Sequence, residues 1–244
     1  MDLVLVHGSF HGSWCWERLI PALELHGHRA IAVDLPISEP GLGADAYAMV
    51  ISEAIDRLDG STAPAIVGHS MAGLVVPLVA ARRPIERLIF LAAFLAQPGQ
   101  SANDQRQAEP IDGLVPPTTA EWTDLGRDVW QIGARTATEL FFHDASAEDA
   151  SWACSRLRPQ CYQVIGEVSP LAAWPAVPSS YIVCRDDRAT NPEWGRRAAV
   201  ERLGTEAIEI DGGHSPFLSR PEELARIIAS ILADRFVDGQ QLAT

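Results

Sequence analysis

Apolar positions along the chain form two alternating patterns. Short, mostly apolar runs occupy residues 3–6, 29–34, 64–67, 87–92, 181–184 and 207–210. Between them, residues 13–26, 44–59, 74–81, 192–203 and the segment from Pro221 carry apolar residues at helical spacing. Unbroken apolar runs are typical of strands covered on both faces of a parallel sheet. The alternation therefore predicts an α/β fold, with a mainly parallel six-stranded sheet and helices on both faces.

The alternation stops between residues 97 and 178, where Pro, Gly, Trp and polar residues are mixed. This stretch is too long for a connecting loop, so we expect helices of its own. The predicted organisation is a core of residues 1–96 and 179–244. A helical cap, residues 97–178, is inserted after the fourth core strand.

One turn in the predicted sheet carries a serine in a setting typical of a nucleophile. The run at 64–67 leads into Gly68-His69-Ser70-Met71-Ala72-Gly73, and an alanine-rich segment follows at 74–81. A strand, a sharp turn and a helix in this order form a nucleophile elbow, which exposes a Ser hydroxyl at a helix N-terminus. The usual pattern is Gly-x-Ser-x-Gly, but here Ala72 takes the last position and the glycine is displaced to Gly73. Taken alone, the motif also suits an ordinary strand-to-helix turn.

Two further strand ends supply an acid and a base for this serine. The strand at 181–184 leads into Asp186 and Asp187, and the strand at 207–210 leads into a Gly-Gly turn and His214. The order Ser, Asp, His is that of an α/β-hydrolase triad, in which the His activates the hydroxyl and the acid orients the His. His214 is the predicted base, while the adjacent Asp186 and Asp187 leave the acid open.

An oxyanion would need two hydrogen-bond donors. The N–H of Met71, at the start of the helix after Ser70, is one candidate. The second should come from the turn after the first strand, where we favour the N–H of Ser9 over that of Phe10.

Charge and composition exclude several other functions. The chain has 19 basic residues, all of them Arg, against 32 acidic ones, for a net charge of −13. The absence of Lys excludes a Walker A lysine, a Schiff-base lysine and a Ser-Lys dyad. An acidic chain without a basic run is a poor nucleic-acid binder and is repelled by anionic membranes, so we expect neither partner. The four cysteines show no metal spacing, and no metal or cofactor is expected. Without a secretion signal, the predicted location is the cytoplasm.

Several motifs together resemble one known family. Residues 5–16 contain the two motifs His7-Gly8 and His11-Gly12. Two further motifs occur later in the chain, Gly68-His69-Ser70-Met71 and Gly212-Gly213-His214. The set resembles the methylesterase/hydroxynitrile lyase branch of the α/β-hydrolases over nearly the whole chain. That branch includes plant salicylate methylesterases and bacterial esterases, some of which hydrolyse pyrethroid esters. The resemblance implies an α/β-hydrolase fold.

The resemblance also bears on the acid and on the reaction. In this family the acid lies three residues after a cysteine-like strand end, here Cys184, and five before a Pro-Glu helix start, which implies Asp187. The lyases of the branch have a Thr after the first His and a Lys after the catalytic His. Here those positions hold Gly8 and Ser215. The implied function is a cofactor-free serine carboxylesterase that acts on a small, largely apolar ester through an acyl-enzyme.

Two alternatives stay open. One is hydroxynitrile lyase or carbon–carbon bond hydrolase chemistry on the same fold, and the other is a small-molecule receptor with vestigial hydrolase activity. The identity of the ester, the side of the pocket that takes its acyl group and the oligomeric state, including a homodimer, are also open.

The substrate pocket is expected to be lined by rings from the cap and from the core loops, although each of these residues also suits core packing. The candidates are Phe10, His11, Phe94, Trp122, Trp130, Phe141, Phe142, Trp174 and Phe217.

Overall fold

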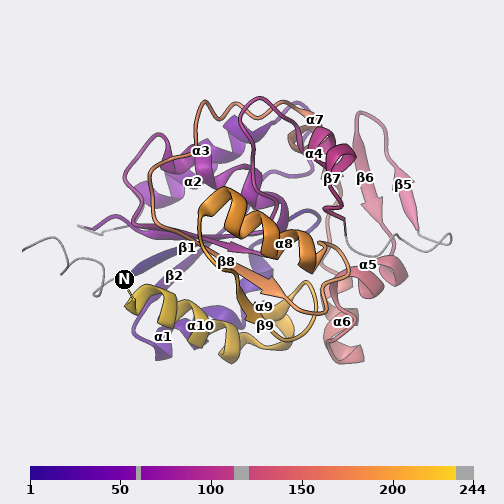
Figure 1. Ribbon diagram of the computed structural model, residues 1–244. Helices are drawn as coiled ribbons and strands as arrows, with labels where there is room; N and C mark the ends of the chain where they lie inside the picture. The colour runs from indigo at the N-terminus through magenta and orange to yellow at the C-terminus, as the bar shows by residue number, and fades with distance from the viewer. Residues whose placement is uncertain (59–61, 113–120, 235–244) are drawn as a thin grey trace, which may run out of the picture.

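The computed structural model describes residues 1–58, 62–112 and 121–234. Its main sheet has six parallel strands in the order β2-β1-β3-β4-β8-β9 (Figure 1). Their bounds are β1 (Asp2–Val6), β2 (Arg29–Val33), β3 (Ala65–His69), β4 (Arg87–Leu91), β8 (Ser179–Cys184) and β9 (Ile208–Ile210). The predicted six-stranded parallel sheet is confirmed.

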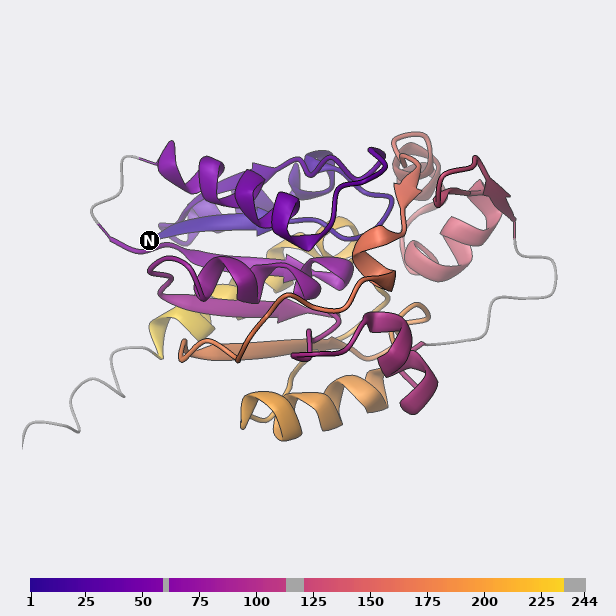
Figure 2. The same cartoon turned by 90° about the horizontal axis from the view of Figure 1, so that it is seen from above.

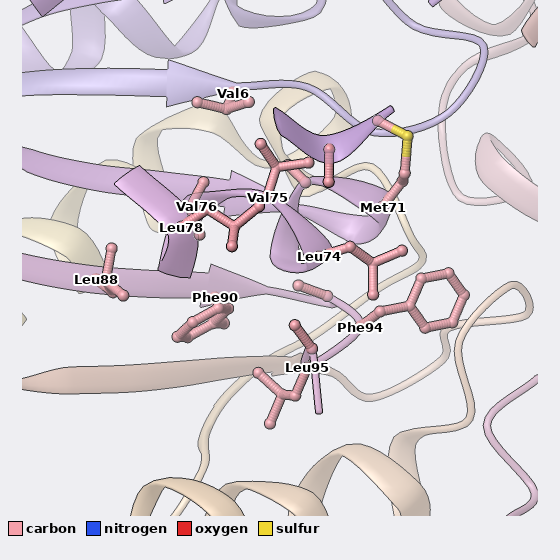
Figure 3. Close-up of a cluster of buried hydrophobic side chains, with 14 of the residues drawn as sticks. Val6, Met71, Leu74, Val75, Val76, Leu78, Leu88, Phe90, Phe94 and Leu95 are labelled. Carbon is pink, nitrogen blue, oxygen red and sulfur yellow. The ribbon is translucent and has the colours of Figure 1, made fainter. Parts of the chain in front are cut away.

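Helices cover both faces of this sheet because successive strand residues point to opposite sides. In β1, Val4 and Val6 pack into one hydrophobic cluster, and Leu3 and Leu5 pack into the other. The first cluster lies beneath α2 (Ala44–Asp56), α3 (Val76–Ala80) and α8 (Pro192–Ala198). The second is covered by α1 (Leu19–Leu25) and α10 (Pro221–Ala233). Figure 3 shows the first cluster, where Leu74 and Phe94 lie near the carboxyl ends of the strands.

Two predicted helices are interrupted. The segment predicted as one helix over residues 13–26 is a 3-10 turn, η1 (Ser13–Trp16), followed by α1 from Leu19. Pro21 explains the break, because proline fits the first turn of a helix but would clash with the carbonyl of residue 17 in a continuous one. The segment 192–203 is α8 followed by a π-helix, η3 (Ala199–Leu203), and ends at Gly204, whose φ of 67° is left-handed.

The segment inserted after β4 contains helices and also a small sheet. Its elements are α4 (Ala102–Ala108), β5 (Trp122–Asp124), β6 (Val129–Ile132), α5 (Ala134–Phe141), α6 (Ala147–Cys154), β7 (Gln160–Cys161) and α7 (Gln163–Gly166). The antiparallel sheet β5-β6-β7 was not predicted, because strands of two to four residues are too short to show an alternating pattern. The division at residues 97 and 178 stays a prediction. Residues 113–120 of the predicted cap, and 59–61 and 235–244 of the predicted core, lie outside the described part.

The topology creates a crevice at the carboxyl edge of the sheet. From β1 the chain passes through α1 to β2 along one face, and it returns through α2 to β3 on the opposite face. The strand order therefore reverses between β1 and β3, which is where open α/β sheets bind ligands. Residues 121–161, pink to salmon in Figure 2, lie beyond the carboxyl ends of the core strands. No helix in the described ranges is long and apolar enough to cross a bilayer.

Candidate active site

Ser70 stands at the reversal point, immediately after β3. Its φ of 53° lies in the left-handed region, which non-glycine residues adopt only where the surrounding structure compensates the strain. The chain turns here into a 3-10 turn, η2 (Ser70–Leu74), before α3. The N–H of Phe94, in the segment after β4, donates to the Ser70 carbonyl at 3.0 Å. The neighbouring strand end thus holds the turn in place.

The displaced glycine of this turn has a steric reason. A Cβ on Gly73 would overlap the carbonyl oxygen of Phe94, so this position has to be glycine. Ala72 is fully buried in the core cluster, where its methyl group contributes to packing. Close approach of the chain after β4 therefore places the required glycine one residue later than in the usual pattern.

His214, which lines the same cavity as Ser70, forms a buried pair with Asp187. The Nδ1–H of His214 donates to Asp187 Oδ2 at 2.8 Å, and both side chains are almost fully buried. The other carboxylate oxygen, Oδ1, accepts from the N–H groups of Ala189 and Thr190 at 2.8 and 2.9 Å. Asp186 is exposed and accepts instead from the Gly212 N–H at 3.3 Å. The structure thus brings Asp187, and not Asp186, to the imidazole, whose Nε2 is left for chemistry.

His69 supports His214 from behind. Its Nε2–H donates to the backbone carbonyl of His214 at 3.0 Å, and the two ring centroids are 4.5 Å apart. Burial holds the pKa of His69 well below its usual range, and the charge of His214 adds to this effect. A neutral ring that is bound in this way positions the base and does not compete with it.

The turn after β1 lies against the same site and carries the two candidate oxyanion donors, the N–H groups of Ser9 and Phe10. The N–H of Phe10 donates to Gln160 Oε1 at 3.4 Å. The N–H of Ser9 makes no hydrogen bond with the described residues, and Ser9 lines the same cavity as Ser70. A Cβ on Gly8 would approach Ser70 Cβ to 2.7 Å, so this turn packs directly on the nucleophile. The arrangement favours Ser9 over Phe10 as the partner of Met71.

Arg158 fixes this turn from the inserted segment. Its N–H donates to the carbonyl of Phe10 at 2.8 Å, and its Nη2 donates to the carbonyls of His11 and Leu35 at 3.0 and 3.1 Å. The guanidinium also binds both oxygens of Asp34. No pattern in the sequence indicates this role, because its partners, which are backbone carbonyls and the carboxylate of Asp34, lie more than 120 residues away.

His7 completes the support. Its Nδ1–H donates to the Gly8 carbonyl at 2.9 Å, and its Nε2 accepts from the Leu35 N–H at 3.0 Å. Burial lowers the pKa of His7 to about 4 and that of His11 to about 3. Both rings are therefore neutral structural groups at pH 7.

Ser70 and His214 open into a cavity of about 330 Å³. Four of the predicted substrate-binding residues line it: Phe10, Phe94, Trp122 and Phe141. Seven lining residues were not predicted: Arg106, Asp112, Leu140, Tyr162, Arg188, Ala189 and Thr190. Four of the seven are next to predicted site residues in the sequence and could have been found from that position, since 188–190 follow the acid and Leu140 precedes Phe141. The sequence gives no indication for Arg106, Asp112 or Tyr162.

The remaining five predicted residues do not line this cavity. Phe217 and His11 pack against His69, with ring centroids 5.0 and 5.7 Å away, and Phe142 packs on His11. Trp174 packs on Phe90 of β4. Trp130 lies in β6, where it pairs with residues of β5 and β7. Their rings fill the core and the small sheet.

The polar wall of the cavity contains one ion pair. Arg106 Nε lies 3.0 Å from Asp112 Oδ1, and the guanidinium lies over the ring of Phe94. Burial raises the pKa of Tyr162 to about 12, so its hydroxyl stays neutral. Across the described ranges, no group of three or more His, Cys, Asp or Glu side chains could hold a metal ion.

Comparison with known proteins identifies the family. Residues 3–227 match the model of the alpha/beta hydrolase family. The chain belongs to this family. It is 30% identical to salicylic acid-binding protein 2 of Nicotiana tabacum, over 93% of this chain and 95% of the relative. It is 27% identical to a pyrethroid hydrolase of Sphingobium wenxiniae, over 100% of this chain and 91% of that protein.

The fold has close structural counterparts. A solved structure of polyneuridine aldehyde esterase superimposes with a TM-score of 0.79 at 23% identity, over 95% of this chain and 98% of that one. At this identity the likeness concerns the fold alone. The sequence-level relatives include esterases, which supports hydrolysis of an ester by this alpha/beta hydrolase.

Proposed function

We propose that this protein is a serine carboxylesterase whose nucleophile, base and acid are Ser70, His214 and Asp187. The observation that carries the proposal is their joint placement. Ser70 is held in a left-handed turn and shares a cavity with His214, whose other nitrogen is bound to the buried carboxylate of Asp187. A serine hydroxyl needs such a base to attack an ester carbonyl at neutral pH.

The reaction would proceed in two halves. Ser70 attacks the carbonyl while His214 takes its proton, and the N–H groups of Ser9 and Met71 stabilise the oxyanion. His214 then protonates the departing alcohol, which leaves an acyl group on Ser70. Water, activated by the same imidazole, releases the acid and restores the serine.

Lyase chemistry receives less support from the site. A side chain at position 8 would have to share space with Ser70 Cβ and with His69 Nδ1, 2.7 and 2.9 Å from a built Cβ. The Ser215 hydroxyl is buried and has no hydrogen-bond partner among the described residues, so this position adds no positive charge beside the base. Neither group that equips the lyases of the branch is present.

The test is hydrolysis of a series of 4-nitrophenyl esters by the wild type and by Ser70→Ala. We expect Ser70→Ala to lower kcat by about 10⁴-fold or more. Ser155→Ala, which removes an exposed hydroxyl bound to its own helix, is the matched control and should leave the rate unchanged. Turnover that survives in Ser70→Ala would refute the mechanism. Cleavage of mandelonitrile without esterase activity would favour the lyase instead.

A further inference from the structure

The cavity contains two arginines in different states. Arg106 is paired with Asp112 at 3.0 Å. Arg188, the residue after Asp187, is half-buried, and within the described residues it makes no hydrogen bond and has no carboxylate within 4.0 Å. The undescribed segment next to Asp112, residues 113–120, contains no acidic residue. Arg188 is thus a cation without a counter-charge in the wall of the cavity.

An arginine without an ion pair is in the minority in this chain. Acidic residues outnumber arginines by 32 to 19, and most of the described arginines form an ion pair. The exceptions apart from Arg188 do not line the cavity. Among the lining residues Arg106 and Asp112 neutralise each other, and the nearby carboxylate of Asp187 lies outside the lining and is bound by His214 and two backbone N–H groups, so Arg188 is the unpaired charge of the cavity wall. Such a site attracts an anion that the rest of the protein would repel.

The geometry of the Arg188 guanidinium indicates which class of anion it would bind. A guanidinium presents parallel N–H donors that match the two oxygens of a carboxylate. A phosphate dianion would meet only one unpaired cation among the residues that line the cavity. Leu140, Phe141 and Trp122 form an apolar part of the same cavity. The ligand that fits has an apolar body and one carboxylate.

We propose that Arg188 binds a free carboxylate of the substrate, and that the natural substrates are small half-esters. One carboxyl group would be esterified and lie at Ser70, and a second, free carboxylate would be bound by Arg188. This inference rests on the proposed esterase function and adds the substrate class to it. The carboxylate can belong to the acyl part, as in a monoester of a dicarboxylic acid, or to the alcohol part.

Two matched substrate pairs separate these sources. Mono-4-nitrophenyl adipate against 4-nitrophenyl methyl adipate places the charge on the acyl side. Then 4-(butanoyloxy)benzoate against its methyl ester places it on the alcohol side. We expect kcat/KM for the charged member of at least one pair to exceed that for the neutral member by about 10- to 100-fold, mainly through a lower KM. Added salt should reduce the ratio because it screens the attraction.

Variants identify the residue. Arg188→Gln should lower this ratio to near one, and Arg188→Lys should retain part of it, because lysine keeps the charge without the planar donors. Arg57→Gln, an exposed arginine at the end of α2 that does not line the cavity, should preserve the ratio. Inhibition of the wild type gives a test that does not depend on whether a variant folds. Adipate should inhibit neutral-ester hydrolysis about 10-fold better than hexanoate.

The outcomes separate the two claims. If neutral esters are hydrolysed in a Ser70-dependent way, but neither pair favours the charged member or the ratio persists in Arg188→Gln, the half-ester inference is wrong and the esterase proposal stands. If no ester in either pair is hydrolysed, the proposed function fails and the inference fails with it.

Discussion

The two sides of the cavity are built differently. On the sheet side, Ser70, Asp187 and His214 follow parallel strands whose ladder fixes where each chain turns, and the supporting hydrogen bonds are buried. On the opposite side, Trp122 and Phe141 come from a short strand and a short helix of the inserted segment. The sheet side can therefore hold reacting groups accurately, while the inserted segment shapes the volume that the substrate fills. We expect substitutions on the first side to change kcat and those on the second to change KM.

The largest effect on the sheet side is expected from Asp187→Asn. Loss of the carboxylate leaves His214 in the wrong tautomer, which in a serine triad lowers kcat by about 10⁴-fold. Asp186→Asn is the matched control, because within the described part of the chain that side chain accepts only from the Gly212 N–H. Steady-state kinetics with a 4-nitrophenyl ester measure both. Equal activity of the two variants would remove Asp187 from the mechanism.

Gly8→Ala tests the packing of the turn on the nucleophile. The added methyl would lie 2.7 Å from Ser70 Cβ and 2.9 Å from His69 Nδ1, so the turn has to move away from the oxyanion. We expect kcat to fall by about 10²- to 10³-fold, as when one oxyanion donor is lost. Gly166→Ala is the control, since its Cβ would meet only Asn103 at 3.6 Å. A Gly8→Ala enzyme with normal kcat would show that the Ser9 amide is not needed.

The buried histidines of the sheet side predict sensitivity to acid. His7 has a pKa of about 4 in the folded protein against about 6.5 when unfolded, so the unfolded chain binds more protons between these values. Burial of the neutral imidazole therefore contributes to the stability of the folded state. This contribution is complete above pH 6.5 and is lost as the pH falls towards 4. For His7 the complete loss amounts to about 3 kcal/mol, roughly 300-fold in the unfolding equilibrium, and about half of it has occurred by pH 5.

Urea unfolding at pH 7 and pH 5 measures this loss. His7→Gln should show a shallower decrease than the wild type. His26→Gln removes an exposed imidazole at the end of α1 and should follow the wild type. A wild-type stability that is the same at both pH values would contradict the burial of neutral histidines at this edge of the sheet.

The smallest expected effect comes from two tryptophans of the inserted segment, Trp122 in the cavity wall and Trp174 in the core. Trp122→Ala removes a ring that lines the cavity and lies 5.7 Å from Phe10, so KM for aryl esters should rise about 10-fold. Trp174→Ala removes a ring that packs on Phe90, and it should lower stability by about 1–3 kcal/mol without changing KM. A larger KM change in Trp174→Ala would reverse the assignment.

The sequence predicts the sheet side far better than the opposite side. Unbroken apolar runs give the strands, and parallel strands bring their carboxyl ends together, so Ser70 and His214 could be named before their contacts were known. The same pattern left Asp186 and Asp187 open as the acid, and only the family resemblance implied Asp187. Residue spacing does not show which way a ring points, and for this reason Trp174 and Phe217 suited the pocket as well as the core. The contacts of Arg158 and the pairing of Arg106 with Asp112 depend on how the inserted segment folds back, which no local pattern records.

The most direct test of the esterase account is covalent labelling by diethyl 4-nitrophenyl phosphate, followed by intact-mass and peptide mass spectrometry. A serine activated by His214 should take up one diethylphosphoryl group per chain, on the peptide that contains Ser70, as esterase activity is lost. Ser70→Ala should remain unlabelled. An unlabelled wild type that still hydrolyses esters, or a label on another residue that abolishes activity, would contradict the assignment of Ser70 as the nucleophile.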